Sequence, residues 1–271
     1  MTKLQINAIG SGFSHDICSC HRSQPANFEW VYKPDGEIEV YFEPSFLAGK
    51  FSNCKNKFLW LSESKALYLQ VYDYIKNNIE ELRCYKKIFV HDTELLAIDP
   101  IFEYCPPGSN KSWIVNGNIY PKSKLVSMIS SGKAVTEGHR FRNATMDYFK
   151  ISNSPVDFFG RYHNPFNEKE EALADYHFSF VIENLQYPHY YTEKIMDCFA
   201  TGTIPIYYGS PEIHKEFNMD GIIVFDKTFD FNSLTKELYY EKMEAIKDNF
   251  NREKNHKIAD DVLYDLIVKE I

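Results

Sequence analysis

The stretch that decides the fold is FSFVIENLQYPHYYTEKIMDCFATGTIPIYYG, residues 178–209. It opens with an apolar run over 178–184 that predicts a strand, passes through a short loop to a helix over 191–201, and ends with a second apolar run over 203–209. Continuously apolar strands joined by a helix are typical of a parallel sheet that is covered on both faces. The stretch therefore predicts a strand–helix–strand unit in an α/β domain.

The same alternation of strands and helices continues on both sides of this stretch. Further apolar, strand-like runs lie at 3–9, 58–62, 86–92, 124–130, 156–160 and 221–226. The exception is an expected hairpin over 27–43, where two alternating runs flank the turn-forming sequence KPDG. The proline, glycine and serine residues of CPPGSNKSW (105–113) interrupt both periods, so we expect the link between two α/β domains there. We place the domains at 1–115 and 116–271, the second ending in two helical stretches over 233–270.

The charge and hydropathy of the chain argue against two classes of protein. The 30 Lys and Arg residues stand against 38 Asp and Glu, a formal charge of −8, which disfavours a nucleic-acid binder held mainly by phosphate contacts. No apolar run approaches the ~18–20 residues of a membrane helix, and the N-terminus lacks the pattern of a secretion signal. We expect a cytoplasmic protein with no transmembrane segment, while peripheral membrane association stays open. The aromatic content of 16% fits either an aromatic core or surfaces that stack on sugar and base rings.

Cysteine usage indicates free thiols. Six cysteines in 271 residues are sparse for a disulfide-held scaffold, so reduced thiols are expected. Cys18, Cys20 and His21 form a C-x-C-H cluster of a kind that could bind zinc, but no second pair at zinc-finger spacing follows. We therefore predict no metal site.

The polar residues of 178–209 gather where the first strand ends. Glu183 and Asn184 close that strand, and Thr192 is placed to cap the next helix by accepting a hydrogen bond from an early amide. Glu193 suits the positive end of the helix dipole, whereas Lys194 is unfavourable there unless an anion lies nearby. A helix N-terminus and a lysine at the end of a parallel strand suit a phosphate group. The alternative is an ordinary strand–helix–strand unit in which Glu193 and Lys194 are merely solvated.

These residues, in this order, resemble the donor-binding signature of a known enzyme family. The matching positions are Glu183-Asn184, Tyr190 or Tyr191, Thr192-Glu193-Lys194, and Thr203 through Gly209. The pattern resembles that of the α1,3/1,4-fucosyltransferases, glycosyltransferase family 10. Upstream, FRNATMDYF (141–149) is similar to the family's helix with an Arg-Asn pair. The sequence departs from the family at Leu185, where many members have serine or threonine, and at Ser130-Ser131, where serine-asparagine is usual.

The resemblance implies a fold and a reaction. The fold would be GT-B-like, with two Rossmann-like domains facing a central cleft, residues 1–115 binding the acceptor and 116–271 the nucleotide sugar. The reaction would move fucose from GDP-fucose to a hydroxyl of an oligosaccharide or glycoconjugate, with inversion and without a metal or cofactor. The implied linkage is of the α1,3 type to a GlcNAc- or glucose-containing saccharide. The alternatives are a GT-B transferase that uses another nucleotide sugar and a non-catalytic nucleotide-sugar-binding protein.

The resemblance also implies roles for individual residues. Arg142 would fork onto the donor pyrophosphate, Lys194 would add a point charge beside the helix amides, and Glu193 would hold the fucose ring. Asn184 and the two tyrosines would surround the ribose, phosphate or base. The complete expected donor-binding set is Arg142, Glu183, Asn184, Tyr190, Tyr191, Thr192, Glu193 and Lys194.

An inverting transfer also needs a general base on the acceptor side, which the family supplies as a glutamate after an apolar strand of its N-terminal half. We expect Glu63, which follows the run over 58–62, to be this base. The alternative is that Glu63 caps a helix beginning near Lys65. Glu94 is the reserve candidate, and His91 is expected to be structural.

Two other features are expected to carry no function. Asn110 and Asn143 begin glycosylation sequons that we interpret as chance matches. The charge run EKEEA (168–172) is expected to be the solvated face of a helix.

Overall fold

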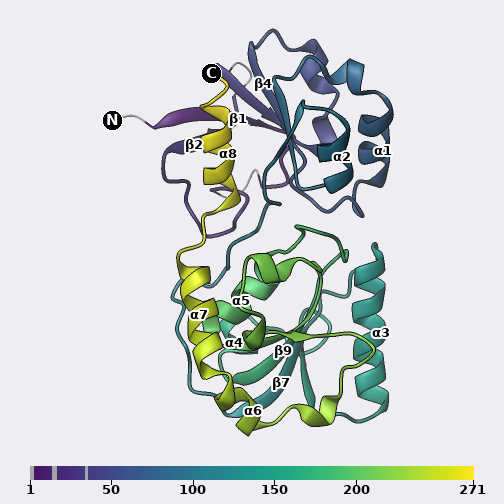
Figure 1. The fold of residues 1–271 in the computed structure, drawn as a ribbon, viewed down its shortest axis with the longest axis vertical. Coiled ribbons are helices and arrows are strands. Elements are labelled where there is room, and N and C mark those ends of the chain that lie inside the picture. Colours follow the sequence, from purple (N-terminus) through teal and green to yellow (C-terminus); the bar gives the residue numbers. More distant parts are fainter. Residues whose placement is uncertain (1–2, 14–16, 34–35) are drawn as a thin grey trace. The chain divides into compact units, whose positions relative to one another are not determined.

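The computed structural model describes residues 3–13, 17–33 and 36–271 and divides into two compact units (Figure 1). The N-terminal unit consists of Met1–Asn110, Pro188–Tyr190 and Lys257–Ile271. The C-terminal unit consists of Lys111–Tyr187 and Tyr191–His256. The units therefore differ from the expected domains chiefly in that the last residues of the chain, from Lys257 on, belong to the N-terminal unit.

The N-terminal unit contains a six-stranded parallel sheet in the order β2-β1-β3-β4-β5-β6. Its strands are β1 (Leu4–Ile9), β2 (Phe28–Val31), β3 (Ile38–Tyr41), β4 (Asn56–Trp60), β5 (Lys87–Val90) and β6 (Phe102–Tyr104). The expected hairpin over 27–43 is wrong, because β2 and β3 both run parallel to β1 and pair with its opposite edges. Alternation shows which side chains of a strand share a face, but neither the partner strand nor the direction of pairing. Within the KPDG turn, residues 34–35 lie outside the described part of the chain.

Helices cover both faces of this sheet. They are α1 (Leu69–Asn77), α2 (Thr93–Ile98) and α8 (Ala259–Ile267). On one face, Phe58 and Phe89 pack in a buried cluster with Leu263 of α8; on the other, Leu59 packs in a cluster with Ile75 of α1. Figure 1 shows α8 beside β1 and β2, and α1 and α2 on the other side of the sheet.

A buried carboxylate, in addition to apolar packing, explains why α8 belongs to the N-terminal unit. Asp260 accepts hydrogen bonds from the backbone amide of Ser19 at 3.1 Å, from the Ser19 hydroxyl at 2.6 Å and from Trp30 Nε1 at 2.6 Å. Asn110 Oδ1 accepts the backbone amide of Ala259 at 2.8 Å. Sequence periodicity predicts that the final helix packs on a sheet, but it does not show on which one. The same contacts give the Asn110 side chain a structural role.

All six cysteines are free thiols in the structure. Cys18 and Cys20 are buried, and the Cys20 thiol donates to Asn110 Oδ1 at 3.3 Å. Burial raises the pKa of Cys20 to about 12, so it is a protonated, inert thiol. Among residues 3–13, 17–33 and 36–271, no group of three or more His, Cys, Asp or Glu side chains is arranged to hold a metal ion.

The C-terminal unit contains a five-stranded parallel sheet in the order β11-β10-β9-β7-β8. Its strands are β7 (Lys124–Ile129), β8 (Val156–Phe159), β9 (Tyr176–Ile182), β10 (Ile204–Tyr208) and β11 (Ile223–Val224). Its helices are α3 (Glu137–Ile151), α4 (Glu170–Leu173), α5 (Glu193–Thr201), α6 (Lys236–Glu241) and α7 (Met243–Lys254). The chain leaves β7 toward β8 on one side and then continues with β9 on the other, so the strand order reverses between β7 and β9. This is a doubly wound sheet, and the expected parallel α/β class is confirmed in both units.

The segment that decides the fold, 178–209, forms the centre of this sheet. Every residue of β9 is buried, as a strand covered on both faces requires. α5 ends at Thr201, and Gly202 adopts φ +67°, a left-handed conformation that favours glycine. Its amide donates to the Phe199 carbonyl at 3.1 Å. The predicted strand–helix–strand unit is confirmed. Among the described residues, no helix has the length and apolar character to cross a membrane.

Candidate functional site

The carboxyl ends of β7 and β9 lie together where the strand order reverses, which is the place where doubly wound sheets bind ligands. Ser130 and Ser131 follow β7, and Glu183 and Asn184 follow β9. Two helices begin beside them. The backbone amide of Gly138, in the first turn of α3, donates to the Asn184 carbonyl at 3.2 Å, and α5 begins one residue after Thr192.

Arg142 faces this edge of the sheet because α3 approaches it closely. A Cβ on Gly138 would lie 2.0 Å from the carbonyl oxygen of Glu183, so only glycine fits at the contact. Arg142 is four residues further along and therefore on the same face of α3. It is 5% exposed; Nη2 donates to Ser131 Oγ at 3.3 Å, while Nε is buried without a hydrogen-bond partner among the described residues. Burial lowers the pKa of Arg142, against the attraction of Glu183 and Glu193, but a guanidinium remains charged.

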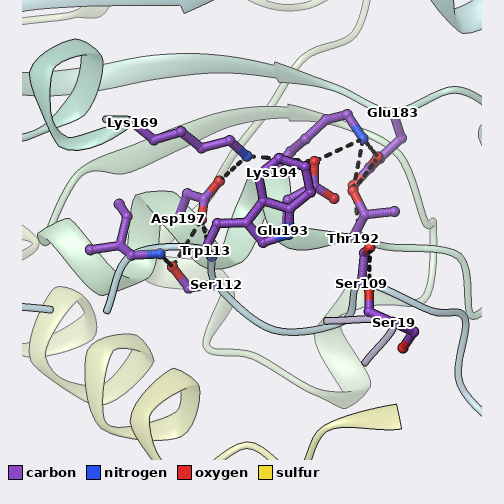
Figure 2. Close-up of polar contacts among 11 residues, drawn as sticks. Ser19, Ser109, Ser112, Trp113, Lys169, Glu183, Thr192, Glu193, Lys194 and Asp197 are labelled. Atoms are coloured by element: carbon purple, nitrogen blue, oxygen red, sulfur yellow. Dashed lines mark hydrogen bonds and ion pairs between the residues drawn. The ribbon is translucent and has the colours of Figure 1, made fainter. Parts of the chain in front are cut away.

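Glu183 is a fully buried carboxylate that organises the loop between β9 and α5. It accepts the backbone amide of Thr192 at 2.9 Å, the Thr192 hydroxyl at 2.9 and 3.0 Å, and Lys194 Nζ at 2.9 Å (Figure 2). The prediction that the Thr192 side chain caps α5 is wrong. Thr192 does occupy the N-cap position, but its hydroxyl makes no capping bond. A buried carboxylate needs hydrogen-bond donors, and the Thr192 hydroxyl donates to Glu183.

Lys194 is a charged side chain whose ammonium is fixed on three sides and still partly accessible. Its Nζ donates to Glu183 Oε2 at 2.9 Å and to Thr192 Oγ1 at 2.8 Å, and lies 3.8 Å from Glu193 Oε1. The side chain is 25% exposed. Burial lowers its pKa, but the carboxylates of Glu183 and Glu193 outweigh that effect and raise the pKa of Lys194 above its ordinary value. The alternative in which Glu193 and Lys194 are merely solvated does not hold.

Glu193 is ionised because two lysines lie beside it. Lys169 Nζ is 3.5 Å and Lys194 Nζ 3.8 Å from Glu193 Oε1. Burial alone would raise its pKa, but the two ammonium groups reverse the shift and lower the pKa of Glu193 below its ordinary value. Figure 2 shows the Glu193 carboxylate between the two lysine side chains.

Lys169 is a site residue that the sequence did not reveal. It lies in the charge run 168–172, which was expected to be solvated, but it is the N-cap residue of the short helix α4 and its side chain is only 16% exposed. Its ammonium pairs with Asp197 as well as Glu193, and lies 4.0 Å from the ring centroid of Trp113. No spacing within 168–172 signals these contacts, because both acidic partners lie on α5.

A neutral histidine, His139, lies beside the positive charges of Arg142 and Lys194 at the ends of β7 and β9. His139, in the first turn of α3, accepts the backbone amide of Thr136 at its Nδ1, at 3.2 Å. Burial, together with the charges of Arg142, Lys194 and Lys133, lowers the pKa of His139 to about 4, so its imidazole is neutral at pH 7. Two helix N-termini, an arginine and a lysine thus converge on one edge, an arrangement that can bind a doubly charged phosphate group.

The two tyrosines of the predicted donor-binding set lie in different units. Tyr190 belongs to the N-terminal unit, where its ring packs on His91 with centroids 5.5 Å apart. Tyr191 belongs to the C-terminal unit, where its hydroxyl lies 3.1 Å from His256 Nε2 and its ring meets the edge of Phe217. Both tyrosines are buried, so each contributes packing in the structure as it stands.

In the N-terminal unit, Glu63 follows β4 and is exposed, as a general base that meets an acceptor must be. Helix α1 begins at Leu69 with Tyr68 as its N-cap, so Glu63 does not cap a helix near Lys65. The reserve candidate Glu94 is 56% exposed and engaged with lysines, and His91 is buried with a pKa that burial lowers to about 4.

A second glutamate, Glu43, lies beside Glu63. Glu43 follows β3, which lies next to β4. The strand order of this sheet reverses between β1 and β3, so Glu43 lies at the switch point, where such sheets bind ligands. Glu43 is 2% exposed, and its Oε1 accepts the backbone amide of Glu63 at 2.6 Å. Burial raises the pKa of Glu43 to about 8. A glutamate directly after an apolar run is the signal in the sequence, but the alternating runs over 27–43 predict a hairpin and not a strand that ends in a sheet of parallel strands.

Comparison with known proteins identifies a family. Residues 119–253 match the model described as the C-terminal part of glycosyltransferase family 10 (fucosyltransferase). The chain is 39% identical over 74 residues to the Alpha-(1,3)-fucosyltransferase FucT of Helicobacter pylori, an alignment that covers 27% of this chain and 15% of that protein. It is 31% identical over 102 residues to the Alpha-(1,3)-fucosyltransferase B of Drosophila melanogaster, covering 38% of this chain and 22% of that protein. The matched segments thus span less than a quarter of either relative.

A solved structure supports the fold over nearly the whole chain. The crystal structure of an alpha1,3-fucosyltransferase with GDP-fucose has a TM-score of 0.56 and 16% identity to this chain, and the match covers 99% of this chain and 89% of that one. At this identity the similarity concerns the fold. Two parallel-sheet α/β domains of the GT-B type were expected from the sequence, and that fold is confirmed.

Proposed function

Since this chain belongs to glycosyltransferase family 10, the fucosyltransferases, we propose that it transfers fucose from GDP-fucose to a hydroxyl of a glycan acceptor. The family supports fucosyl transfer as the reaction class. An acceptor that contains GlcNAc or glucose, an α1,3-type linkage and inversion at the anomeric carbon are the finer parts of the proposal.

The observation that carries the proposal is the group of positive charges at the ends of β7 and β9. Arg142 Nε is buried and has no hydrogen-bond partner among the described residues, which is costly unless a ligand supplies an acceptor. A pyrophosphate can accept from this guanidinium and from Lys194, beside the N-termini of α3 and α5. These groups would stabilise the charge that develops on GDP as it leaves.

The proposed step is a direct displacement at C1 of fucose. The acceptor oxygen forms a bond to C1 of fucose while the bond from C1 to the β-phosphate oxygen breaks, and the electron pair of that bond leaves with GDP. The proton of the acceptor hydroxyl passes to Glu63, the proposed general base. Glu193, which is kept ionised by two lysines, would hold the fucose hydroxyls and favour oxocarbenium-like charge at C1.

We propose that the reaction needs no metal or cofactor, because Arg142 and Lys194 can carry the charge of the leaving pyrophosphate. Rates that are unchanged by a chelator would support this, and a loss of transfer that Mg²⁺ or Mn²⁺ restores would contradict it. The six free thiols support the cytoplasm as the place of action, because oxidising compartments favour disulfides.

A nucleotide-sugar panel tests the donor. The melting temperature of the protein is measured with GDP-fucose, GDP-mannose, GDP and a UDP-sugar. Each nucleotide sugar that raises the melting temperature is then incubated with the protein and a library of glycan acceptors, and release of the nucleotide is followed. GDP-fucose should raise the melting temperature more than the other sugars and should alone support transfer. Equal stabilisation by GDP-mannose or a UDP-sugar would contradict fucose as the donor. Binding of GDP-fucose without transfer to any acceptor or to water would favour a non-catalytic binding protein.

A further inference from the structure

Lys169 connects two carboxylates of α5 to the chain that precedes β9. Its ammonium pairs with Asp197 and lies 3.5 Å from Glu193 Oε1, and the indole ring of Trp113 covers it at 4.0 Å (Figure 2). Asp197 is itself fixed, because its Oδ1 accepts the Ser112 hydroxyl at 2.9 Å and the Trp113 backbone amide at 2.8 Å. The ammonium of Lys169 therefore has little freedom to move.

We propose that Lys169 is a positioning residue that keeps the Glu193 carboxylate ionised and in place for the donor sugar. The proposal rests on the proposed function, in which Glu193 faces that sugar. Nothing in it requires Lys169 to touch the donor.

Lys194 cannot perform this task alone. In the proposed function it must also neutralise the pyrophosphate, and its ammonium is already shared between Glu183 at 2.9 Å and Glu193 at 3.8 Å. A donor that draws Lys194 toward its phosphates weakens the pair with Glu193. Lys169 is held by Asp197 and Trp113, so its charge stays beside Glu193 whichever partner Lys194 takes.

The charges that face Glu193 come from three helices. Lys169 is at the N-cap of α4, Lys194 and Asp197 are on α5, and Arg142 is on α3. Asp197 repels a negative charge on Glu193, and Lys169 balances that repulsion. Removing the Lys169 charge therefore removes its attraction for the Glu193 carboxylate and leaves the repulsion between Asp197 and Glu193 unbalanced. An opposite charge at such a distance typically lowers a carboxyl pKa by about one unit or more.

The competing explanation is that Lys169 only clamps α4 to α5 through Asp197. Two substitutions separate the explanations. Lys169→Met removes the charge and keeps most of the side-chain volume, so it affects both the clamp and Glu193. Asp197→Asn weakens the clamp but leaves the ammonium near Glu193. Lys169→Arg restores a charge, and Lys247→Met is the control, since Lys247 is an exposed lysine of α7 that pairs only with Glu244 among the contacts of the described residues.

The experiment combines a pKa that needs no substrate with steady-state kinetics. The pKa of Glu193 is measured by ¹³C NMR of its carboxyl carbon, assigned with Glu193→Gln, and GDP affinity is measured by calorimetry. We expect Lys169→Met to raise the pKa of Glu193 by about one unit and to move the acid limb of the kcat–pH profile upward equally. We expect kcat at pH 7 to fall about 10- to 100-fold, because the Glu193 carboxylate, which stays ionised there, is no longer held in place, while Kd for GDP stays within about twofold. Lys169→Arg should recover most of kcat.

The outcomes separate this inference from the proposed function. Suppose that the wild type is active and that Lys169→Met and Asp197→Asn lower the melting temperature and kcat equally, with no rise in the pKa of Glu193. This result would overturn the inference and leave the proposed function standing. A wild type that transfers no sugar would overturn the proposed function and this inference with it. A rise in the pKa of Glu193 together with lost kcat in Lys169→Met, and neither in Lys247→Met, would support it.

Discussion

Glu43 Oε1 accepts the backbone amide of Glu63 at 2.6 Å, which couples the two glutamates that follow the neighbouring parallel strands β3 and β4. One of them is buried and the other exposed. The buried carboxyl of Glu43 fixes the backbone of Glu63, so the Glu63 side chain is held at the carboxyl ends of the strands. A change of charge at Glu43 should therefore affect both the stability of the N-terminal unit and the position of Glu63.

The first prediction concerns the stability of Glu43→Gln as a function of pH. Burial raises the pKa of Glu43 from 4.5 to about 8, so between these values the folded state holds a proton that the unfolded state has released. The free energy of unfolding contributed by this group must then fall as pH rises from about 4.5 to about 8. Glutamine can still accept the Glu63 amide and does not ionise. Relative to wild type, Glu43→Gln should gain about 3 kcal/mol between pH 5 and pH 8.

Urea unfolding at pH 5, 6.5 and 8 measures this difference. Glu94→Gln, at an exposed glutamate of the same unit, is the control and should show no such trend. A stability difference between Glu43→Gln and wild type that is independent of pH would show that Glu43 ionises at its ordinary pKa.

The second prediction concerns the acceptor side. Glu63→Gln should lower the rate of transfer about 10²- to 10⁴-fold, because an amide cannot take the proton of the acceptor hydroxyl. The affinity for GDP-fucose should be unchanged, since Arg142, Glu193 and Lys194, the charged residues proposed to hold the donor, lie in the C-terminal unit. Initial rates and donor titrations on the same preparation check both statements. If Glu94→Gln lost transfer and Glu63→Gln did not, the reserve candidate would be the base.

The third prediction concerns the pyrophosphate. Arg142→Lys should weaken GDP binding about tenfold, because a lysine offers one point charge where the guanidinium can donate two parallel hydrogen bonds. The melting temperature without ligand should change little, since the one hydrogen bond of Arg142 among the described residues is long, to Ser131 at 3.3 Å. Calorimetric titration with GDP measures the change. An unchanged Kd would exclude Arg142 from the phosphate site, whatever the effect on transfer.

Much of the C-terminal unit could be predicted from its sequence, because the information is local there. The run over 178–184, the helix with its Gly202 cap and the strand that follows are each specified by neighbouring residues. Lys194 could be singled out because a lysine at a helix N-terminus conflicts with the dipole. Arg142 could be singled out only through the family resemblance, because an arginine within a helix is compatible with its local sequence and gives no signal of a site.

The rest depends on contacts between distant parts of the chain. Lys169 is one of several charges in 168–172, and only the position of α5 in space shows that Asp197 and Glu193 bury it. The pairing of strands could not be predicted locally either. The run that ends at Glu43 alternates like a strand of a hairpin, but it pairs with β1 in parallel. Adjacent residues such as Tyr190 and Tyr191 belong to different units, which no local pattern specifies.

The last prediction concerns the contact that brings α3 to the end of β9. A methyl group on Gly138 would lie 2.0 Å from the Glu183 carbonyl oxygen and 2.6 Å from the Asn184 carbonyl oxygen. Both atoms belong to the backbone, so the helix itself must move, although alanine has the higher helix propensity. Gly138→Ala should cost about 1–3 kcal/mol of stability. It should also weaken GDP binding, because Arg142 moves with the helix. Chemical denaturation and calorimetry measure the two effects. Gly12→Ala, where a Cβ meets nothing within 4 Å, is the matched control, and equal behaviour of the two variants would contradict this close contact.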